Sequence, residues 1–179
     1  MINPIPDYCH HFLFPLVGDR MLELGNKKTG DVSYKSWFEA QGITHVSVDW
    51  NGEDGALRLD MREPLPDWDQ FDMITNFGCT EHVETQYNIW ESMHRLLKVG
   101  GVQIHMCPMP GDWGWHGTHY PHIAFYTEYA ERNGYRIDHL AIGRVSPTRN
   151  IDVRMTKLEH KPFVMPSAST MFYNEMRPR

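Results

Sequence analysis

The stretch RMLELG, residues 20–25, decides how the rest of the chain is interpreted. Residues 20–24 have the length and the apolar content of a buried strand, and Gly25 ends that strand. Glycine lets the main chain approach a ligand closely. A strand that ends in an acid, here Glu23, and then a glycine suits a nucleoside bound at the edge of a parallel sheet.

Strand-length apolar segments and helical patterns alternate downstream of this stretch. Tyr34, Trp37 and Phe38 lie on one face of a helix that Gly42 ends. The alternation predicts βαβ units on a parallel sheet. Helices are expected over about 32–41 and 84–97, and from the N-cap Thr127 to Gly134. Further strands are expected at 44–49, 56–59, 71–76, 102–107, 135–144 and 151–160.

The composition narrows the class of protein. The 179 residues suit one domain with one core, and 41% hydrophobic residues argue against disorder. The net charge is −6 and no cluster of Lys and Arg stands out, so we expect no nucleic-acid partner. No segment approaches the ~20 apolar residues of a membrane span, so we expect no membrane partner.

The cysteines and the N-terminus bear on the cellular compartment. Cys9, Cys79 and Cys107 form no CxxC pair and are odd in number, which favours a reducing compartment over a disulfide framework. The N-terminus lacks the basic and apolar regions of a signal peptide. We therefore expect a cytoplasmic protein.

The residues that end the predicted strands are candidates for ligand binding, because ligands of an open parallel sheet lie beyond the carboxyl ends of its strands. A carboxylate such as Asp49 can accept from both ribose hydroxyls, and Trp50 offers a flat face for adenine. Asp60 can accept from the adenine amino group. The predicted cofactor residues are Glu23, Gly25, Asn26, Asp49, Trp50, Asp60, Met61 and Asn76.

Several motifs resemble those of the class I S-adenosylmethionine-dependent methyltransferases, and together they span about residues 20–160. LELG at 22–25 resembles the first glycine motif of that family, and SVDWNG at 47–52 resembles its ribose-binding strand end. TEHV at 80–83 matches a Glu-His pair common in the subgroup that methylates small molecules. The segments at 59–76, 96–108 and 125–137 resemble the family's later strands and last helix. Within that family, this chain most resembles the short methyltransferase-like proteins encoded in phage genomes and surface-glycan gene clusters.

The resemblance implies an α/β fold: a doubly wound, Rossmann-like, seven-stranded sheet, mostly parallel, in a three-layer α/β/α arrangement. It implies S-adenosylmethionine as cofactor and a small molecule, with a saccharide as one option, as the O- or N-acceptor of a methyl group. The methyltransferase-like domain would cover 19–161, between an N-terminal arm or partial lid at 1–18 and an irregular C-terminal tail at 162–179. The oligomeric state is not determined by these motifs, and a homodimer is one option.

The loop after Glu23 departs from the family pattern. Lys27 and Thr29 occupy positions where glycines are common, although Asn26 tolerates left-handed backbone angles. Lys27 or Lys28 could pair with the cofactor carboxylate, or both could be solvated loop lysines. Because of this altered loop, an alternative function remains open: a catalytically degenerate protein of the methyltransferase fold with a binding or structural role. The absence of GxGxxG argues against a nicotinamide dehydrogenase.

The candidate catalytic residues are Glu81, His82 and His116. Methyl transfer requires donor and acceptor to be aligned, and an acceptor hydroxyl or amine must lose a proton, for which histidine is the usual base. In the resembling subgroup the loop with Glu81 and His82 borders the methyl group. His116 lies in the loop 108–122, whose glycines Gly111, Gly114 and Gly117 would give mobility. The alternative for His82 is that it caps or packs the following helix.

The other histidines are expected to be structural or solvated. His116, His119 and His122 form an HxxHxxH pattern near Asp112, but this spacing matches no strong metal signature, so we expect no metal site. His94 and His105 lie beside an apolar helix face and within a central strand. Both are expected to be buried and hydrogen-bonded.

Overall fold

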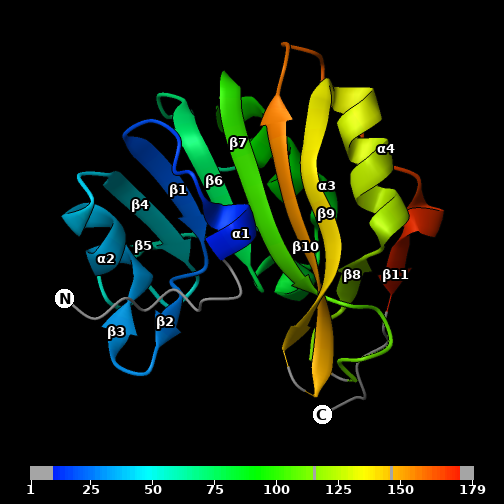
Figure 1. Ribbon diagram of the computed structural model, residues 1–179, viewed down its shortest axis with the longest axis horizontal. Helices are drawn as coiled ribbons and strands as arrows, with labels where there is room; N and C mark the ends of the chain where they lie inside the picture. The colour runs from blue at the N-terminus through cyan, green and yellow to red at the C-terminus, as the bar shows by residue number, and fades with distance from the viewer. Residues whose placement is uncertain (1–9, 115, 146, 174–179) are drawn as a thin grey trace.

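A seven-stranded sheet forms the centre of the computed structural model, which describes residues 10–114, 116–145 and 147–173 (Figure 1). Its strand order is β5-β4-β1-β6-β7-β10-β9. All pairings from β5 to β7 are parallel, and β10 runs antiparallel to both of its neighbours. The strands are β1 Arg20–Leu24, β4 Thr44–Asp49, β5 Leu57–Arg58, β6 Phe71–Phe77, β7 Leu97–Pro108, β9 Tyr135–Val145 and β10 Thr148–Lys157. The predicted doubly wound, mostly parallel sheet is confirmed.

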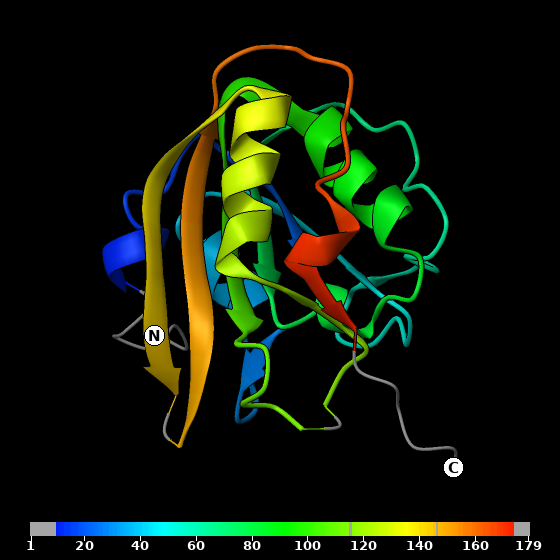
Figure 2. The same cartoon turned by 90° about the vertical axis from the view of Figure 1, so that its right-hand side faces the viewer.

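Helices cover both faces of this sheet, as the predicted three layers require. The α-helices are α1 His10–Leu13, α2 Tyr34–Ala40, α3 Gln86–Leu96 and α4 Ile123–Asn133. Figure 2 shows α3 and α4 together on one face and α1 on the other. Shorter elements are η2 Thr80–His82, η3 Ala168–Thr170, and the strands β2 Lys28–Thr29, β3 Val32–Ser33, β8 His119–Pro121 and β11 Met171–Tyr173. No helix of the described residues has the length and apolar character needed to cross a membrane.

Two apolar layers hold the helices to the sheet. On the α3 and α4 face, the buried Trp90 ring packs against Phe125 and Tyr129, with ring centroids 4.6 and 5.5 Å apart. The Trp90 indole N–H donates to Gln86 within the same helix at 2.8 Å, so its one polar atom is satisfied. On the other face, the fully buried Phe38 of α2 stacks on His45 of β4, with ring centroids 5.7 Å apart, and belongs to one apolar cluster with Met21 of β1 and Met73 of β6. The helix periodicity seen in the sequence therefore reflects these two buried faces.

The start of α4 differs from the prediction. Thr127 lies inside the helix, where its hydroxyl donates to the carbonyl of Ile123 at 3.3 Å, and His122 occupies the N-cap position. The N-cap prediction was wrong because β8 pairs with β11 and ends at Pro121, so the helix can start directly afterwards. The helix ends as expected at Gly134, which has a left-handed φ of 73°.

The tail is also more ordered than predicted. In the described residues after 161, β11 extends the structure beside β8. Asn133 ties the preceding segment to α4, because its amide donates to the carbonyl of Val164 and accepts from the Val164 N–H. These contacts depend on residues far apart in sequence, and the local composition gave no sign of them.

The described part of the N-terminal arm is docked onto β10. The Arg154 guanidinium donates to the carbonyl oxygens of Phe12, Leu13 and Pro15, at 3.2, 2.8 and 2.8 Å. Phe12 and Leu13 are fully buried. One charged side chain therefore satisfies the buried carbonyl groups of Phe12 and Leu13 and also binds the carbonyl of Pro15, which is an exposed residue.

We expect Arg154→Ala to lower the free energy of unfolding by about 2–4 kcal/mol, because it removes charge-assisted hydrogen bonds and leaves buried carbonyls unpaired. Denaturant titration measures the change. Arg136→Ala is the matched control, since Arg136 makes an exposed ion pair worth about 0–1 kcal/mol. Equal losses in the two variants would contradict the anchoring role of Arg154.

Candidate active site

A cleft of about 980 Å³ opens at the carboxyl ends of β1, β4, β5 and β6. Two long helix-free connections, Trp50 to Ala56 and Leu59 to Gln70, leave this edge of the sheet uncovered. The predicted cofactor residues that line the cleft are Gly25, Asp49, Trp50, Asp60 and Met61. Of the predicted catalytic residues, His82 lines it. Glu23, Asn26 and Asn76 lie outside the lining.

Asp49 organises the inner wall of the cleft. One carboxylate oxygen accepts from the Asn26 N–H at 3.2 Å, and the other accepts from the Asn51 N–H at 3.1 Å. Each oxygen has a second lone pair free for a ligand hydroxyl. The neighbouring Trp50 is 72% exposed, so its ring is available to stack. Gly25 has a φ of 73°, and a side chain there would touch Cys79, so glycine keeps this wall open.

Glu23 lies beneath this wall. Its side chain is fully buried, with one carboxylate oxygen 3.1 Å from Nε2 of His45. Burial raises the pKa of Glu23, and His45 together with the Lys27 backbone opposes that rise. Glu23 is therefore a buried residue next to His45, a partner that the sequence analysis did not identify.

The two loop lysines differ in their contacts. Lys28 forms an ion pair with Asp54. The ammonium of Lys27 lies beside Gly78, since a Cβ built on Gly78 would be 3.8 Å from it. Gly78 lines the cleft, so Lys27 is the lysine placed to meet an anionic group there.

Asp60 and Met61 form the outer wall. Arg62 binds the Asp60 carboxylate through its guanidinium at 2.7 Å and its backbone N–H at 3.0 Å. The side-chain hydrogen bond from Arg62 lowers the pKa of Asp60 to about 2, so this carboxylate stays charged at neutral pH. Met61 contacts the sulfur of Cys79 at 3.8 Å and gives the cleft an apolar floor. Arg62 itself lines the cleft and was not among the predicted residues.

Asn76 shapes the turn that follows β6. Its side-chain oxygen accepts from the N–H groups of Cys79 and Thr80, and its amide donates to the Thr80 hydroxyl at 2.9 Å. The side chain is fully buried and its hydrogen bonds lie within the protein. Asn76 therefore positions η2, which carries Glu81 and His82, and does not reach the cleft.

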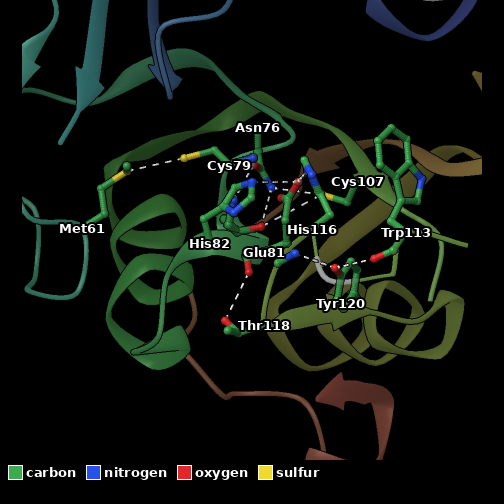
Figure 3. A network of polar contacts seen from close by, with 12 residues as sticks. Met61, Asn76, Cys79, Glu81, His82, Cys107, Trp113, His116, Thr118 and Tyr120 are labelled. Carbon is green, nitrogen blue, oxygen red and sulfur yellow. Dashed lines mark hydrogen bonds and ion pairs between the residues drawn. The ribbon is translucent and has the colours of Figure 1, made fainter. Parts of the chain in front are cut away.

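Glu81, His82 and His116 converge at the edge of the cleft (Figure 3). Oε1 of Glu81 lies 3.8 Å from Nε2 of His82 and 3.6 Å from Nε2 of His116. The two imidazole rings meet edge to face, with centroids 4.7 Å apart. The structure thus brings together the three predicted catalytic residues, although His116 comes from a different segment of the chain.

The loop that carries His116 is held against Glu81. The Thr118 N–H donates to the Glu81 carbonyl at 2.8 Å. The Tyr120 hydroxyl accepts from the Gly117 N–H and donates to the Trp113 carbonyl at 2.9 Å. A side chain at Gly117 would lie 2.7 Å from the Glu81 carbonyl, so glycine serves close packing here. The mobility that Gly111, Gly114 and Gly117 would give to this loop stays a prediction.

His82 is the member of this group whose ionisation is perturbed. Burial lowers its pKa from the ordinary value, His116 and Lys27 lower it further, and Glu81 opposes these effects. His82 is therefore mostly neutral at pH 7, the state in which an imidazole can accept a proton.

The HxxHxxH pattern does not form one site. Asp112 is bound by the Arg149 guanidinium, which lowers the pKa of this carboxyl. His119 bonds to the Thr118 hydroxyl at 2.9 Å and packs against Tyr173. His122 occupies the N-cap position of α4. His116 alone of the three lies beside Glu81.

His94 and His105 are buried structural residues, as predicted. His94 contacts the Tyr135 hydroxyl at 3.1 Å and the Lys161 carbonyl at 2.8 Å. His105 is fully buried and contacts Gln103 at 3.1 Å. Burial lowers the pKa of His94 to about 4 and that of His105 to about 3, so both are neutral.

Comparison with known proteins gives a family match. Residues 29–104 match the family model described as "Methyltransferase domain". None of the curated protein sequences is significantly similar to the chain. The matched segment contains β4, β5 and β6, as well as the Glu81–His82 pair.

Solved structures share the fold. An N1-methyltransferase for 1,6-didemethyltoxoflavin from Burkholderia thailandensis has a TM-score of 0.61 and 15% identity, over 84% of this chain and 75% of that one. An O-methyltransferase of a trans-AT PKS multienzyme from Brevibacillus brevis has a TM-score of 0.59 and 13% identity, over 80% and 67%.

A TehB-like methyltransferase from Corynebacterium glutamicum has a TM-score of 0.55 and 18% identity, over 78% of this chain and 80% of that one. At such identities the likeness shows the fold. The chain therefore has the fold of these S-adenosylmethionine-dependent methyltransferases, and its residues 29–104 match the methyltransferase-domain model.

Proposed function

We propose that this protein transfers a methyl group from S-adenosylmethionine to an oxygen or nitrogen of a small molecule. One observation carries the proposal: Glu81, His82 and His116 meet at the edge of the cleft that Asp49 and Trp50 line. A group that can take a proton thus lies beside a site with nucleoside-binding features. The similar O- and N-methyltransferases, two of which were crystallised with S-adenosylhomocysteine, support the same activity.

The cleft has side chains that fit the cofactor. Asp49 has free acceptor capacity for the ribose hydroxyls, and the exposed Trp50 ring offers a face for adenine. Lys27 lies beside Gly78 and can pair with a carboxylate. Because Gly25 has no side chain, the cofactor can approach the main chain closely at this position. When bound, the cofactor supplies the activated methyl group.

The acceptor would lie between His82 and the loop that carries His116. Neutral His82 is suited to accept the proton that a hydroxyl or ammonium group must lose, and Glu81 would stabilise the resulting imidazolium. His116 can hydrogen-bond the acceptor or act as a second base. Trp113 packs against His116, with ring centroids 5.0 Å apart, and could stack on a sugar, which keeps a saccharide among the acceptors.

The second candidate function is that of a catalytically degenerate protein that binds a ligand without turnover. The observation in its favour is the loop after Glu23, where Lys27 and Thr29 occupy positions at which glycines are common in the family, and Thr29 belongs to the β2–β3 hairpin. The two functions differ in whether bound S-adenosylmethionine is ever consumed.

A methyl-transfer assay separates these functions. The protein is incubated with S-adenosylmethionine labelled in its methyl group and with a panel of small alcohols, amines, phenols and saccharides. Mass spectrometry then measures S-adenosylhomocysteine and labelled product. The proposal predicts acceptor-dependent formation of both, lost in Glu81→Gln and retained in His119→Ala. Cofactor binding without product from any acceptor would favour the degenerate protein.

Trp50 gives a separate test of the adenine position. We expect S-adenosylhomocysteine to change the tryptophan fluorescence of the wild type, because the ligand would cover a ring that is 72% exposed. The change should be much smaller in Trp50→Phe, which keeps an aromatic ring but removes the indole. The same ligand-induced change in both proteins would refute stacking on Trp50.

A further inference from the structure

The group formed by Glu81, His82 and His116 has the composition of a metal site. Their ligand atoms, one from each side chain, all lie within 4.8 Å of one another. Two imidazoles and one carboxylate form a common ligand set for catalytic zinc. We propose that these three residues bind a divalent transition-metal ion, with zinc as the favoured ion. This replaces the expectation of no metal that the HxxHxxH spacing gave.

The distances from the Glu81 carboxylate to the two imidazole nitrogens fit metal coordination better than direct hydrogen bonds. The Glu81 oxygen lies 3.6 and 3.8 Å from the two histidine nitrogens, which is too long for a hydrogen bond. Tetrahedral zinc with bonds of about 2.1 Å separates its ligand atoms by about 3.4 Å. Small side-chain adjustments would therefore bring the three atoms around one ion.

The electrostatics of Glu81 point to a cation. Its side chain is fully buried, and neither carboxylate oxygen has a hydrogen-bond partner among the described residues. A buried carboxylate without partners is costly unless a positive charge compensates it. The side chains of His82 and His116 are 47% and 41% exposed, which leaves a path for an ion to enter.

The ligands are held in place before any ion binds. Asn76 fixes the turn that carries Glu81 and His82. Thr118 ties the His116 loop to the Glu81 carbonyl, and Gly117 allows their close approach. A site built on such a fixed framework loses little entropy when an ion binds. The Lys27 ammonium lies beside Gly78 and would oppose a cation at this site, so the charge of the Glu81 carboxylate must offset it.

Three protein ligands leave one position of a tetrahedral ion open, as in catalytic zinc sites. The identity of the fourth ligand rests on the proposed function. Because His82 lines the cleft, an ion bound to it would lie at the cleft, where an acceptor hydroxyl oxygen could take the open position. With its Nε2 bound to the ion, His82 would no longer accept the proton as it does in the metal-free form of the proposed function. The ion would instead lower the pKa of that hydroxyl, and its proton would pass to solvent. The oxygen would then bond to the methyl carbon while the carbon–sulfur bond breaks and its electron pair stays on sulfur. The acceptor class is thereby narrowed to hydroxyl compounds.

The test measures metal binding directly. Untagged protein, treated with a chelator and dialysed, is titrated with zinc sulfate by calorimetry and with cobalt(II) by visible absorption, which reports tetrahedral coordination. We expect one ion per chain at this site, with affinity at least about tenfold weaker in Glu81→Gln and in His116→Ala. His119→Ala, from the same loop, is the matched control and should bind like the wild type.

Two outcomes would overturn the inference: no zinc binding by the wild type, or equal affinity in the wild type and both variants. Because Glu81 is buried, thermal unfolding without metal checks that Glu81→Gln folds, and the partly exposed His116 carries the test if it does not. A parallel titration with S-adenosylhomocysteine keeps the two proposals apart. Zinc binding without cofactor binding would count against the proposed function alone, and the reverse would count against the metal alone.

Discussion

His116→Ala should lower turnover by roughly 10²-fold or more while S-adenosylmethionine affinity stays within about twofold of the wild type. His116 lies 3.6 Å from Glu81 and outside the lining of the cofactor cleft. Its loss removes a group that handles the acceptor, whether as base, hydrogen-bond partner or metal ligand. The turnover number is measured as S-adenosylhomocysteine release with the acceptor that the panel identifies.

The neighbouring His119 provides the comparison for this variant. It lies in the same segment but packs against Tyr173, so His119→Ala should keep near-normal turnover. Full activity in His116→Ala would show that the loop 108–122 has been misassigned. So would a loss of cofactor affinity as severe as that of Asp49→Ala, or a loss of turnover that only follows a loss of stability.

Asp49→Ala should weaken S-adenosylhomocysteine binding by about 1.5–3 kcal/mol, which is roughly 10- to 150-fold in affinity. The carboxylate lines the cleft at the end of β4, with one lone pair of each oxygen free for the ribose. It also accepts from the N–H groups of Asn26 and Asn51, so part of the loss would come from a looser loop.

Asp54→Ala is the matched control for the cofactor site. Asp54 belongs to the same connection and pairs with Lys28, but it does not line the cleft. Calorimetry should find its affinity for S-adenosylhomocysteine close to that of the wild type. Unchanged affinity in folded Asp49→Ala would remove Asp49 from the ribose site.

The sheet could be predicted because its central strands carry their own signal. Phe71–Phe77 is buried almost throughout, and the sequence shows this as a strand-length segment that is mostly apolar, with Phe71, Met73, Ile74 and Phe77. Gly134 ends its helix with a left-handed φ that few other residues adopt, so it too could be predicted. Such features depend on local sequence alone.

Elements set by distant pairing could not be predicted. Strand β8 exists because β11, far along the chain, pairs with it, and this pairing also fixes where α4 starts. Neither short segment has a strand signal of its own. Thr127 therefore looked like a helix cap although it lies within the helix.

In the candidate site too, some features could be predicted from the local sequence and others depend on contacts between distant segments. Asp49 and Trp50 could be found from their place at a strand end, because the fold puts such positions beside the ligand. The roles of Glu23 and Asn76 could not, since both also stand at strand ends but point into the protein. The approach of His116 to Glu81 depends on a backbone hydrogen bond from Thr118, which no sequence pattern encodes.

A calorimetric titration of the purified protein tests the central claim most directly, namely that the 980 Å³ cleft binds S-adenosylmethionine. S-adenosylmethionine, S-adenosylhomocysteine and NAD are compared under the same conditions. The account predicts one binding site per chain for the two sulfur compounds, weakened by Asp49→Ala, and no binding of NAD. NAD binding, or no binding of S-adenosylmethionine and S-adenosylhomocysteine by the folded wild type, would contradict it.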